Sequence, residues 1–303
     1  MNPGPLLTLF LLLAVAPALP GLATRTRALL TGRRGAPVLQ LYRDLARLIR
    51  KNVVYSRTTT LVFRIGPIVV LASVVVAATL LPLDGHSALF SFGGDLVAFT
   101  GLLGLGRFAL VLAGLDTGSS FEGMGASREV TVSAFAEPAL LLCLTVLVLA
   151  TGELSLAGML GDRLAAVWSG AAPSLALTAA ALFMLTLAET SRVPVDDPAT
   201  HLELTMIHEV IVLDHSGPEL AMILFGNAVK LALFGTLVVG VLVPLGKLPP
   251  WLEPIVLVAG LGLVAVAVGV VESSMARLRM NRVPQFLVAA AALAVFGVIL
   301  LLR

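Results

Sequence analysis

Long uninterrupted apolar runs are the feature that most limits what this 303-residue chain can fold into. A helix needs about 20 mainly apolar residues to cross the hydrocarbon core of a bilayer. The runs of that kind cover residues 5–23, 61–82, 96–115, 132–152, 171–189, 219–244, 252–272 and 284–302. Lipid leaves only helices and closed barrels as spanning structures, and these runs are too long for barrel strands. We therefore predict an all-α polytopic membrane protein, with eight transmembrane helices in a single integral-membrane domain over residues 1–303.

Composition supports this class. Charged residues make up 13% of the chain, about half of the ~25% that is typical of soluble domains, and hydrophobic residues make up 58%. These values exclude a disordered chain, a coiled coil, a secreted disulfide scaffold and an ordinary soluble enzyme. The 20 Lys and Arg nearly balance the 18 Asp and Glu, so we expect a lipid bilayer and no nucleic acid as a partner.

The single cysteine, Cys143, lies inside an apolar run. One cysteine excludes a disulfide, and it excludes a Cys-ligated iron–sulfur cluster, which needs about four thiolates. We therefore expect this chain to bind no cofactor and no metal, and to hold no catalytic residue. Any redox centre must belong to a partner subunit.

The distribution of positive charge predicts the orientation. Nine Lys and Arg residues fall between the first two runs, whereas Arg163 and Lys247 are the Lys and Arg of the loops expected on the opposite side. Because positive charge accumulates on the cytoplasmic side, the loops at 24–60, 116–131, 190–218 and 273–283 are predicted to face the cytoplasm of a prokaryotic inner membrane. Both termini then lie outside. No Lys or Arg precedes the first run, which favours a retained helix over a signal peptide.

Residues 37–51 predict an amphipathic helix lying at the membrane interface. Apolar side chains recur at spacings of three and four residues, and Pro37 suits the first helical position. The polar face carries Gln40, Arg43, Asp44, Arg47, Arg50 and Lys51. Basic helices of this kind lie in the headgroup plane. A helix that only anchors the chain in lipid and a helix that roofs a cavity or forms a docking surface are both consistent with the pattern.

Three charged residues lie inside the apolar runs: Arg107, Glu137 and Lys230. Ionisable side chains in the membrane are costly and mark ion pathways or paired sites. Pro138 follows Glu137 and removes one helix hydrogen bond, which frees a carbonyl beside the carboxylate. Static ion pairs that specify helix packing are one interpretation. A polar track for ions, to which Glu137 contributes a titratable carboxyl, is the interpretation that we favour.

The loop at 190–218 is unusually acidic for a cytoplasmic loop. It follows Glu189, and Arg192 is its single Lys or Arg. Its acids are Asp196, Asp197, Glu203, Glu209 and Asp214. The pair Asp197-Pro198 predicts a helix from there to about residue 213, with His201 and His208 on one face. A surface that exchanges protons or docks a partner is favoured over solvated acids. It is also favoured over a metal site, because His208-Glu209 lacks the second histidine of a zinc motif.

This loop resembles subunit 1 of respiratory complex I. Glu189, Arg192, Pro194, Asp196, Pro198, Glu203, Leu204 and the pair Ser216-Gly217 match its signature. Residues 189–209 resemble more closely the branch of that family found in membrane-bound [NiFe] hydrogenases of the formate hydrogenlyase and hydrogenase-4 type. The resemblance extends to Arg33-Arg34, Gln40 and Arg43-Asp44 in the first loop, and to Glu122, Arg128-Glu129 and Glu137-Pro138.

The resemblance implies a role for the chain. Such a subunit joins a soluble module, the hydrogenase large and small subunits with their [NiFe] and iron–sulfur centres, to antiporter-like membrane subunits. From this resemblance together with the charges inside the apolar runs, we predict that the residues of ion coupling are Arg107, Glu137, Glu189, Arg192, Glu203 and Lys230. The residues that we predict for docking or for the loops are Arg33, Arg34, Gln40, Arg43, Asp44, Glu122, Arg128, Asp196, Asp197, His201, His208, Glu209 and Asp214.

Two alternatives stay open at this point. One is the quinone-site subunit of a complex I-like quinone reductase, and the other is a free-standing ion or solute transporter. His201 stands where complex I has an acid, and Asp214-His215 replaces its Glu-Tyr pair. These departures favour the hydrogenase branch.

Overall fold

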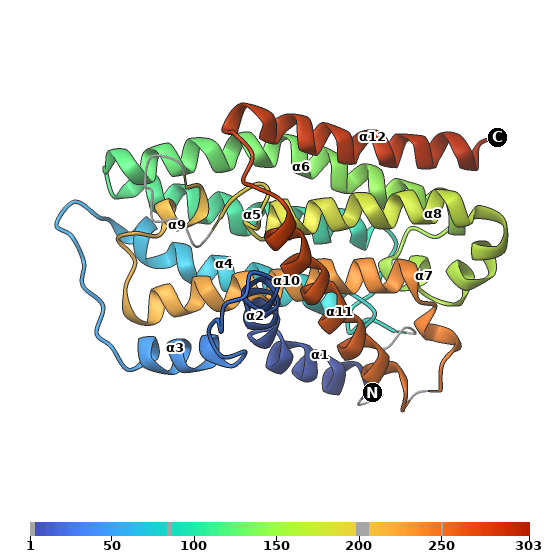
Figure 1. Ribbon diagram of the computed structural model, residues 1–303, viewed down its shortest axis with the longest axis horizontal. Helices are drawn as coiled ribbons and strands as arrows, with labels where there is room; N and C mark the ends of the chain where they lie inside the picture. Colours follow the sequence, from blue (N-terminus) through green and yellow to red (C-terminus); the bar gives the residue numbers. More distant parts are fainter. Residues whose placement is uncertain (1–3, 84–86, 198–205, 250) are drawn as a thin grey trace.

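The computed structural model describes residues 4–83, 87–197, 206–249 and 251–303, and within these residues every regular element is a helix (Figure 1). The long ones are α4 (Leu61–Leu80), α5 (Asp95–Asp116), α6 (Ser120–Thr151), α8 (Asp162–Glu189), α10 (Gly217–Leu242), α11 (Glu253–Ser274) and α12 (Val283–Leu301). Each is long and apolar enough to cross a membrane. The all-α polytopic class is therefore confirmed.

The first apolar run forms a broken helix pair. α1 (Gly4–Val15) and α2 (Ala18–Leu30) are bent by 41° about the Ala16-Pro17 break. Proline at this point cannot donate to the helix ladder, so the axis changes direction there. Among the described residues the protein has seven spanning helices, or eight when this bent pair counts as one span.

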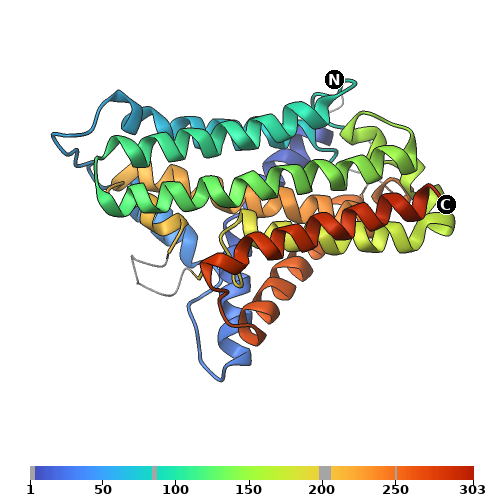
Figure 2. The ribbon, with the colours of Figure 1, turned by 90° about the horizontal axis from the view of Figure 1, so that it is seen from above.

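Most of the long helices run along the long axis of the molecule, whereas α2 and α11 pack side by side and leave that layer obliquely (Figure 2). α3 (Gln40–Ile49) and α9 (His208–Ile211) lie at one end of the bundle. Both chain ends lie toward the other end (Figure 1). The remaining elements are the short helix α7 (Leu156–Leu160) and two 3-10 turns, η1 (Leu245–Lys247) and η2 (Met280–Arg282).

Two helices begin earlier than hydropathy predicts. α6 starts at Ser120 and not near residue 132, so the predicted 116–131 loop is reduced to residues 117–119. α8 starts at Asp162 and not at residue 171, where Ala171 interrupts it with φ −118° and ψ 17°. Hydropathy ends a span at charged residues, but the buried carboxyl of Glu122 and the paired Glu129 are held by protein and not by lipid.

The predicted interfacial helix is present but shorter. α3 begins at Gln40, so Pro37 lies before the helix and does not occupy its first turn. Its partly buried side packs against α2 and α10, and the hydroxyl of Tyr42 donates to the carbonyl of Ala14. Arg43 and Arg47 point to the exposed side. α3 is therefore held against the bundle as well as being placed for an interface.

The contact between α2 and α11 depends on glycine. A Cβ added to Gly269 would lie 2.5 Å from the carbonyl oxygen of Ala23 and 2.7 Å from Cβ of Thr26. Backbones that approach this closely tolerate no side chain between them, which is the usual reason for small residues at membrane helix contacts. Gly262, on the same helix, faces α2 with only Leu22 Cδ2 nearby, at 3.9 Å.

We predict that Gly269→Ala separates α2 from α11 and destabilises the protein by about 1–3 kcal/mol, as overpacking of a tight contact does. Gly262→Ala is the matched control, because its Cβ would make an ordinary van der Waals contact. The measurement is the thermal unfolding midpoint in detergent. Equal midpoints for the two variants would contradict the close approach.

Candidate functional site

A buried arginine in the middle of α5 joins three carboxylates. The side chain of Arg107 is 7% exposed. Its Nη1 lies 2.6 Å from Glu137 Oε1 and its Nη2 lies 2.5 Å from Glu189 Oε2. Its Nε lies 3.4 Å from Glu129 Oε1. Glu129 and Glu137 are separated by about two helical turns of α6, so both carboxylates reach the same guanidinium from one face.

Lys230 of α10 adds a second cation. Its Nζ lies 2.6 Å from Glu189 Oε2, so the carboxylate of Glu189 binds two cations from two helices. Glu189 is the last residue of α8 and its side chain is 4% exposed. The structure thus brings together Arg107, Glu137, Glu189 and Lys230, all of which the sequence singled out. We call these four residues with Glu129 the ion network; two cations face three carboxylates, a formal charge of −1.

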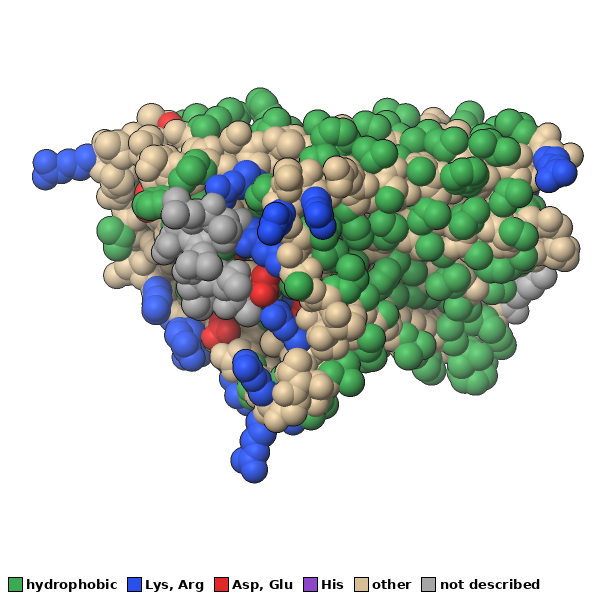
Figure 3. Space-filling view, turned by 45° about the horizontal axis from the view of Figure 1, so that its top comes forward, with side chains coloured by type: hydrophobic (Ala, Val, Ile, Leu, Met, Phe, Trp, Pro, Cys, Tyr) green, Lys and Arg blue, Asp and Glu red, His purple; other side chains and the backbone are tan. Residues whose placement is uncertain are grey.

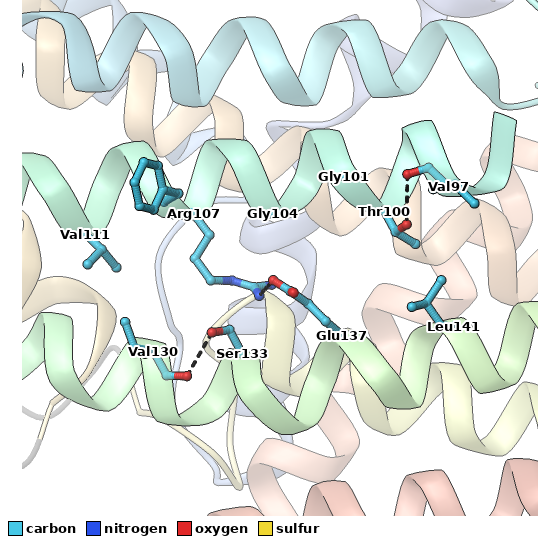
Figure 4. A pocket seen from close by; sticks show the side chains of 11 residues that line it. Val97, Thr100, Gly101, Gly104, Arg107, Val111, Val130, Ser133, Glu137 and Leu141 are labelled. Carbon is cyan, nitrogen blue, oxygen red and sulfur yellow. Dashed lines mark hydrogen bonds and ion pairs between the residues drawn. The ribbon is translucent and has the colours of Figure 1, made fainter.

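Glu137 is the member of the ion network that reaches the surface of the bundle. Its side chain is 46% exposed, although it stands well inside α6. It faces a groove of about 530 Å³ between α5 and α6, and Figure 4 shows Arg107 and Glu137 pointing toward one another across it. Gly101 and Gly104 of α5 line the same groove. The ion network is therefore open on the α5–α6 face of the molecule.

The first part of the acidic loop is tied to other elements by ion pairs. Arg192 Nη1 lies 3.2 Å from Glu272 of α11. Asp197 lies 2.9 Å from Arg27 of α2. Asp196 lies 3.2 Å from Arg277, and its other carboxylate oxygen accepts the backbone N–H groups of Ile207 and His208 at 3.0 and 3.1 Å. Asp196 and Asp197 are buried, so both hold the loop in place.

The helix predicted from Asp197 to residue 213 is wrong in its described part. Helical structure is confined to α9, His208–Ile211, and Met206 and Ile207 are not helical. Asp197 pairs with Arg27, whereas Asp196 accepts the backbone N–H groups of Ile207 and His208 at the start of α9. The predicted site residues His201 and Glu203 lie outside the described residues.

The remaining predicted residues divide into exposed and buried ones. Arg33, Arg34, Arg43 and Asp214 are exposed. Gln40 donates to Asp44 at 3.0 Å within α3. Glu122 is buried, and Arg128 donates to the carbonyl of Met206 at 2.7 Å, which links α6 to the loop. Glu209 lines a cavity beneath the loop. The exposed residues are therefore available to a partner, whereas the buried or bonded ones hold the chain's own elements together.

A second polar group near the loop was missed by sequence reasoning. His215 stacks on Phe63 with ring centroids 4.0 Å apart, and Glu219 accepts a hydrogen bond from Tyr55 at 2.6 Å. That hydrogen bond raises the pKa of Tyr55, and burial lowers the pKa of His215. Glu129 was matched to the family but was given no role, and Asn227 was not singled out. The signal for Glu129 was its eight-residue spacing from Glu137, which the predicted start of the span at 132 concealed.

The surface separates charged and apolar regions. Figure 3 shows most of the visible Lys and Arg side chains, with a few Asp and Glu, toward one end of the molecule, while the flanks of the helices are mainly hydrophobic. Among the residues that the structure describes, no three His, Cys, Asp or Glu side chains gather in a way that could hold a metal ion.

Comparisons with known proteins agree on one family. The sequence pattern that defines the NADH dehydrogenase family matches residues 5–302. Hydrogenase-4 component C of Escherichia coli (strain K12) is 35% identical over 237 residues, which cover 78% of this chain and 74% of that protein. Formate hydrogenlyase subunit 4 of the same organism is 32% identical over 287 residues, which cover 93% and 92%.

More distant relatives share the same scaffold. A subunit of the NADH-quinone oxidoreductase of Polaromonas naphthalenivorans (strain CJ2) is 26% identical over 231 residues, covering 72% of this chain and 61% of that protein. A chain of the membrane-bound sulfane sulfur reductase (MBS), an archaeal respiratory membrane complex, superposes with a TM-score of 0.83 at 20% identity. That superposition covers 98% of each chain and shows that the fold is shared. The resemblance predicted from the acidic loop is confirmed.

We predict that Glu189→Gln destabilises the protein by about 3–5 kcal/mol, because it leaves two buried cations short of a carboxylate. Glu153→Gln is the control: Glu153 pairs with Arg163, whose side chain is 64% exposed, and such surface pairs contribute about 0–1 kcal/mol. The thermal unfolding midpoint of the purified protein in detergent measures both. An equally small shift in the two variants would show that the ion network does not hold the bundle together.

Proposed function

This chain belongs to the NADH dehydrogenase (complex I subunit 1) family, and from that premise we propose that it is a membrane subunit of an energy-converting [NiFe]-hydrogenase-like complex of the formate hydrogenlyase and hydrogenase-4 type. In this role it docks the soluble redox module and couples it to ion translocation. The ion network, which joins four membrane helices and opens on the flank of the bundle at Glu137, is the observation that carries the proposal.

We place the redox centres in partner subunits. The chain has a single cysteine, Cys143, and it is buried in α6, so thiolate ligation of an iron–sulfur cluster by this chain alone has no support. The [NiFe] and iron–sulfur centres then belong to the hydrogenase large and small subunits. In this proposal the chain contributes position, charge and titratable side chains, and no redox centre.

The docking surface that we propose is the end of the bundle bearing α3 and α9. Arg33 and Arg34 are exposed in the connection after α2, and Arg43 is exposed on α3. Asp196 and Asp197, which the sequence favoured for docking, are buried in pairs within the chain, so they secure the loop beneath this surface. In the proposed orientation this end faces the cytoplasm of an inner membrane, and both termini lie on the outer side.

We predict that Arg33→Glu combined with Arg34→Glu releases the soluble module from membranes while this chain still inserts. The two side chains are exposed, so charge reversal there leaves the fold intact and changes only what the surface attracts. Arg163→Glu is the control, because Arg163 is exposed in the first turn of α8, at the end of that helix opposite to Glu189. Membrane-bound hydrogenase subunits are measured after washing at ordinary salt. Retention in both variants would contradict the docking surface.

For ion coupling, the exposed side of the Glu137 carboxylate must be shielded from lipid. A carboxylate facing lipid would cost several kcal/mol, so this half-exposed side chain needs protein or water on its open side. We propose that an antiporter-like membrane subunit lies over the groove between α5 and α6 and receives the carboxyl there. Because the ion network carries one more carboxylate than cations, a proton or a donor from the neighbour can complete it.

We predict that Glu137→Gln assembles into the complex but lowers ion movement at least about tenfold, which corresponds to about 1.4 kcal/mol in a barrier. Glutamine keeps the shape of the side chain and a hydrogen bond to Arg107, but it cannot take up or release a proton. Glu153→Gln is the control, since Glu153 lies outside the ion network. Ion uptake into inverted membrane vesicles is measured together with hydrogenase turnover. Full ion movement in an assembled Glu137→Gln complex would remove Glu137 from the coupling.

A further inference from the structure

His208, the first residue of α9, separates two cavities. On one side is a void of about 30 Å³, lined also by Arg107, Glu129 and Lys230 of the ion network. On the other side is a cavity of about 210 Å³ beneath the acidic loop, and Arg192, Asp196 and Glu209 also line it. Asn227 of α10 lines both as well. The imidazole and this amide therefore form the partition between the loop cavity and the ion network.

One ring nitrogen of His208 is buried and lacks a partner. Nε2 is inaccessible and makes no hydrogen bond to any residue that the structure describes. A buried polar atom left in this way costs about 1–3 kcal/mol. The adjacent void exceeds the roughly 10–15 Å³ that one water requires, and Glu129, Lys230 and Asn227 line it. A water bound in this void would lie against His208 and would link it to the ion network.

The position of the ring is fixed by two contacts of α9. The carboxylate of Asp196 accepts the backbone N–H of His208 at 3.1 Å. Three residues on, Ile211 packs into space left by Gly114 of α5 and Gly125 of α6; an added Cβ at either glycine would meet Ile211 side-chain carbons at 2.8 Å. The partition is therefore seated on the same two helices that carry Arg107 and Glu129.

Charged side chains line both of the cavities that His208 contacts. Arg107 of α5, Glu129 of α6, and Lys230 of α10 line the void; Arg192, Asp196 and Glu209 line the loop cavity. Burial lowers the pKa of His208, and Lys230 lowers it further, while Glu129 and Asp196 oppose the shift. Burial therefore favours the neutral form of the ring. A neutral ring has one nitrogen that donates and one that accepts, so it can pass a proton through itself.

We propose that His208 carries protons, one at a time, between the cavity beneath the acidic loop and the ion network. A proton from the loop cavity binds the nitrogen facing it, and the other nitrogen gives its own proton through the void to Glu129. One proton enters and one leaves, so the ring is neutral again, and reversal of the tautomer resets it. This inference rests on the proposed coupling function and assigns to a named side chain the step between the docking end and the membrane network.

The first test uses His208→Gln and His208→Phe in the whole complex in inverted vesicles. Neither side chain can be protonated, and phenylalanine also fills the ring's volume. We expect assembly, a loss of ion movement of about tenfold or more, and loss of its dependence on pH. His208→Ala is expected to regain part of the movement when imidazole is added. His215→Gln is the matched control, a buried loop histidine that stacks on Phe63, and its pH profile should equal that of the wild type.

The outcomes separate this inference from the proposed function. Wild-type ion movement and pH profile in assembled His208→Gln and His208→Phe, with Glu137→Gln inactive, would overturn the role of His208 and leave the coupling function standing. Wild-type movement in all three variants would overturn both.

A second measurement does not depend on the folding of a His208 variant. Nitrogen NMR of histidine-labelled complex should show the His208 ring titrating below its usual range, and Glu129→Gln should move that midpoint lower, because Glu129 favours the charged ring. A ring whose nitrogen signals change neither with pH nor on the Glu129→Gln substitution would overturn the proposal.

Discussion

The pairing of Arg107 with Glu189 is the interaction on which the rest of the bundle depends. A guanidinium cannot lie in the middle of a membrane protein without a nearby anion, since its desolvation would cost far more than a helix contact supplies. Glu189, at the end of α8, supplies this anion. Its carboxylate also forms an ion pair with Lys230. Four helices are thus held at fixed distances by charges that none of them could bury alone.

The acidic loop depends on the same physics. Arg192, Asp196 and Asp197 each bind an opposite charge on a different part of the chain: Glu272 of α11, Arg277, and Arg27 of α2. A segment tied at three points cannot move without moving its anchors or breaking a pair. Because the loop also holds the start of α9 through Asp196, a displacement at the docking end would reach His208 directly. This continuity gives the proposed coupling a physical route from the surface to the ion network.

The class of fold could be predicted from the sequence because the hydropathy of a segment can be calculated from its residues alone. Each helix must satisfy its own backbone and face lipid on part of its surface, so run length alone indicates a span. The same reasoning misplaced the starts of α6 and α8, where charged residues continue a helix under the cover of neighbouring helices. It also missed the pairing of Asp197 with Arg27, because the pattern of residues contains no trace of a partner 170 positions earlier.

By itself, the sequence determined that this is an all-α membrane protein of the complex I subunit 1 family, and that Arg107, Glu137 and Lys230 need partners. The acidic loop supplied the family through residue identity over a long stretch, and the cost of charge in lipid supplied the need for pairing. Only the tertiary structure decided which carboxylate meets which cation, that Asp196 and Asp197 face inward, and that His208 stands between two cavities. Those facts depend on distances between helices far apart in the chain, which no local pattern encodes.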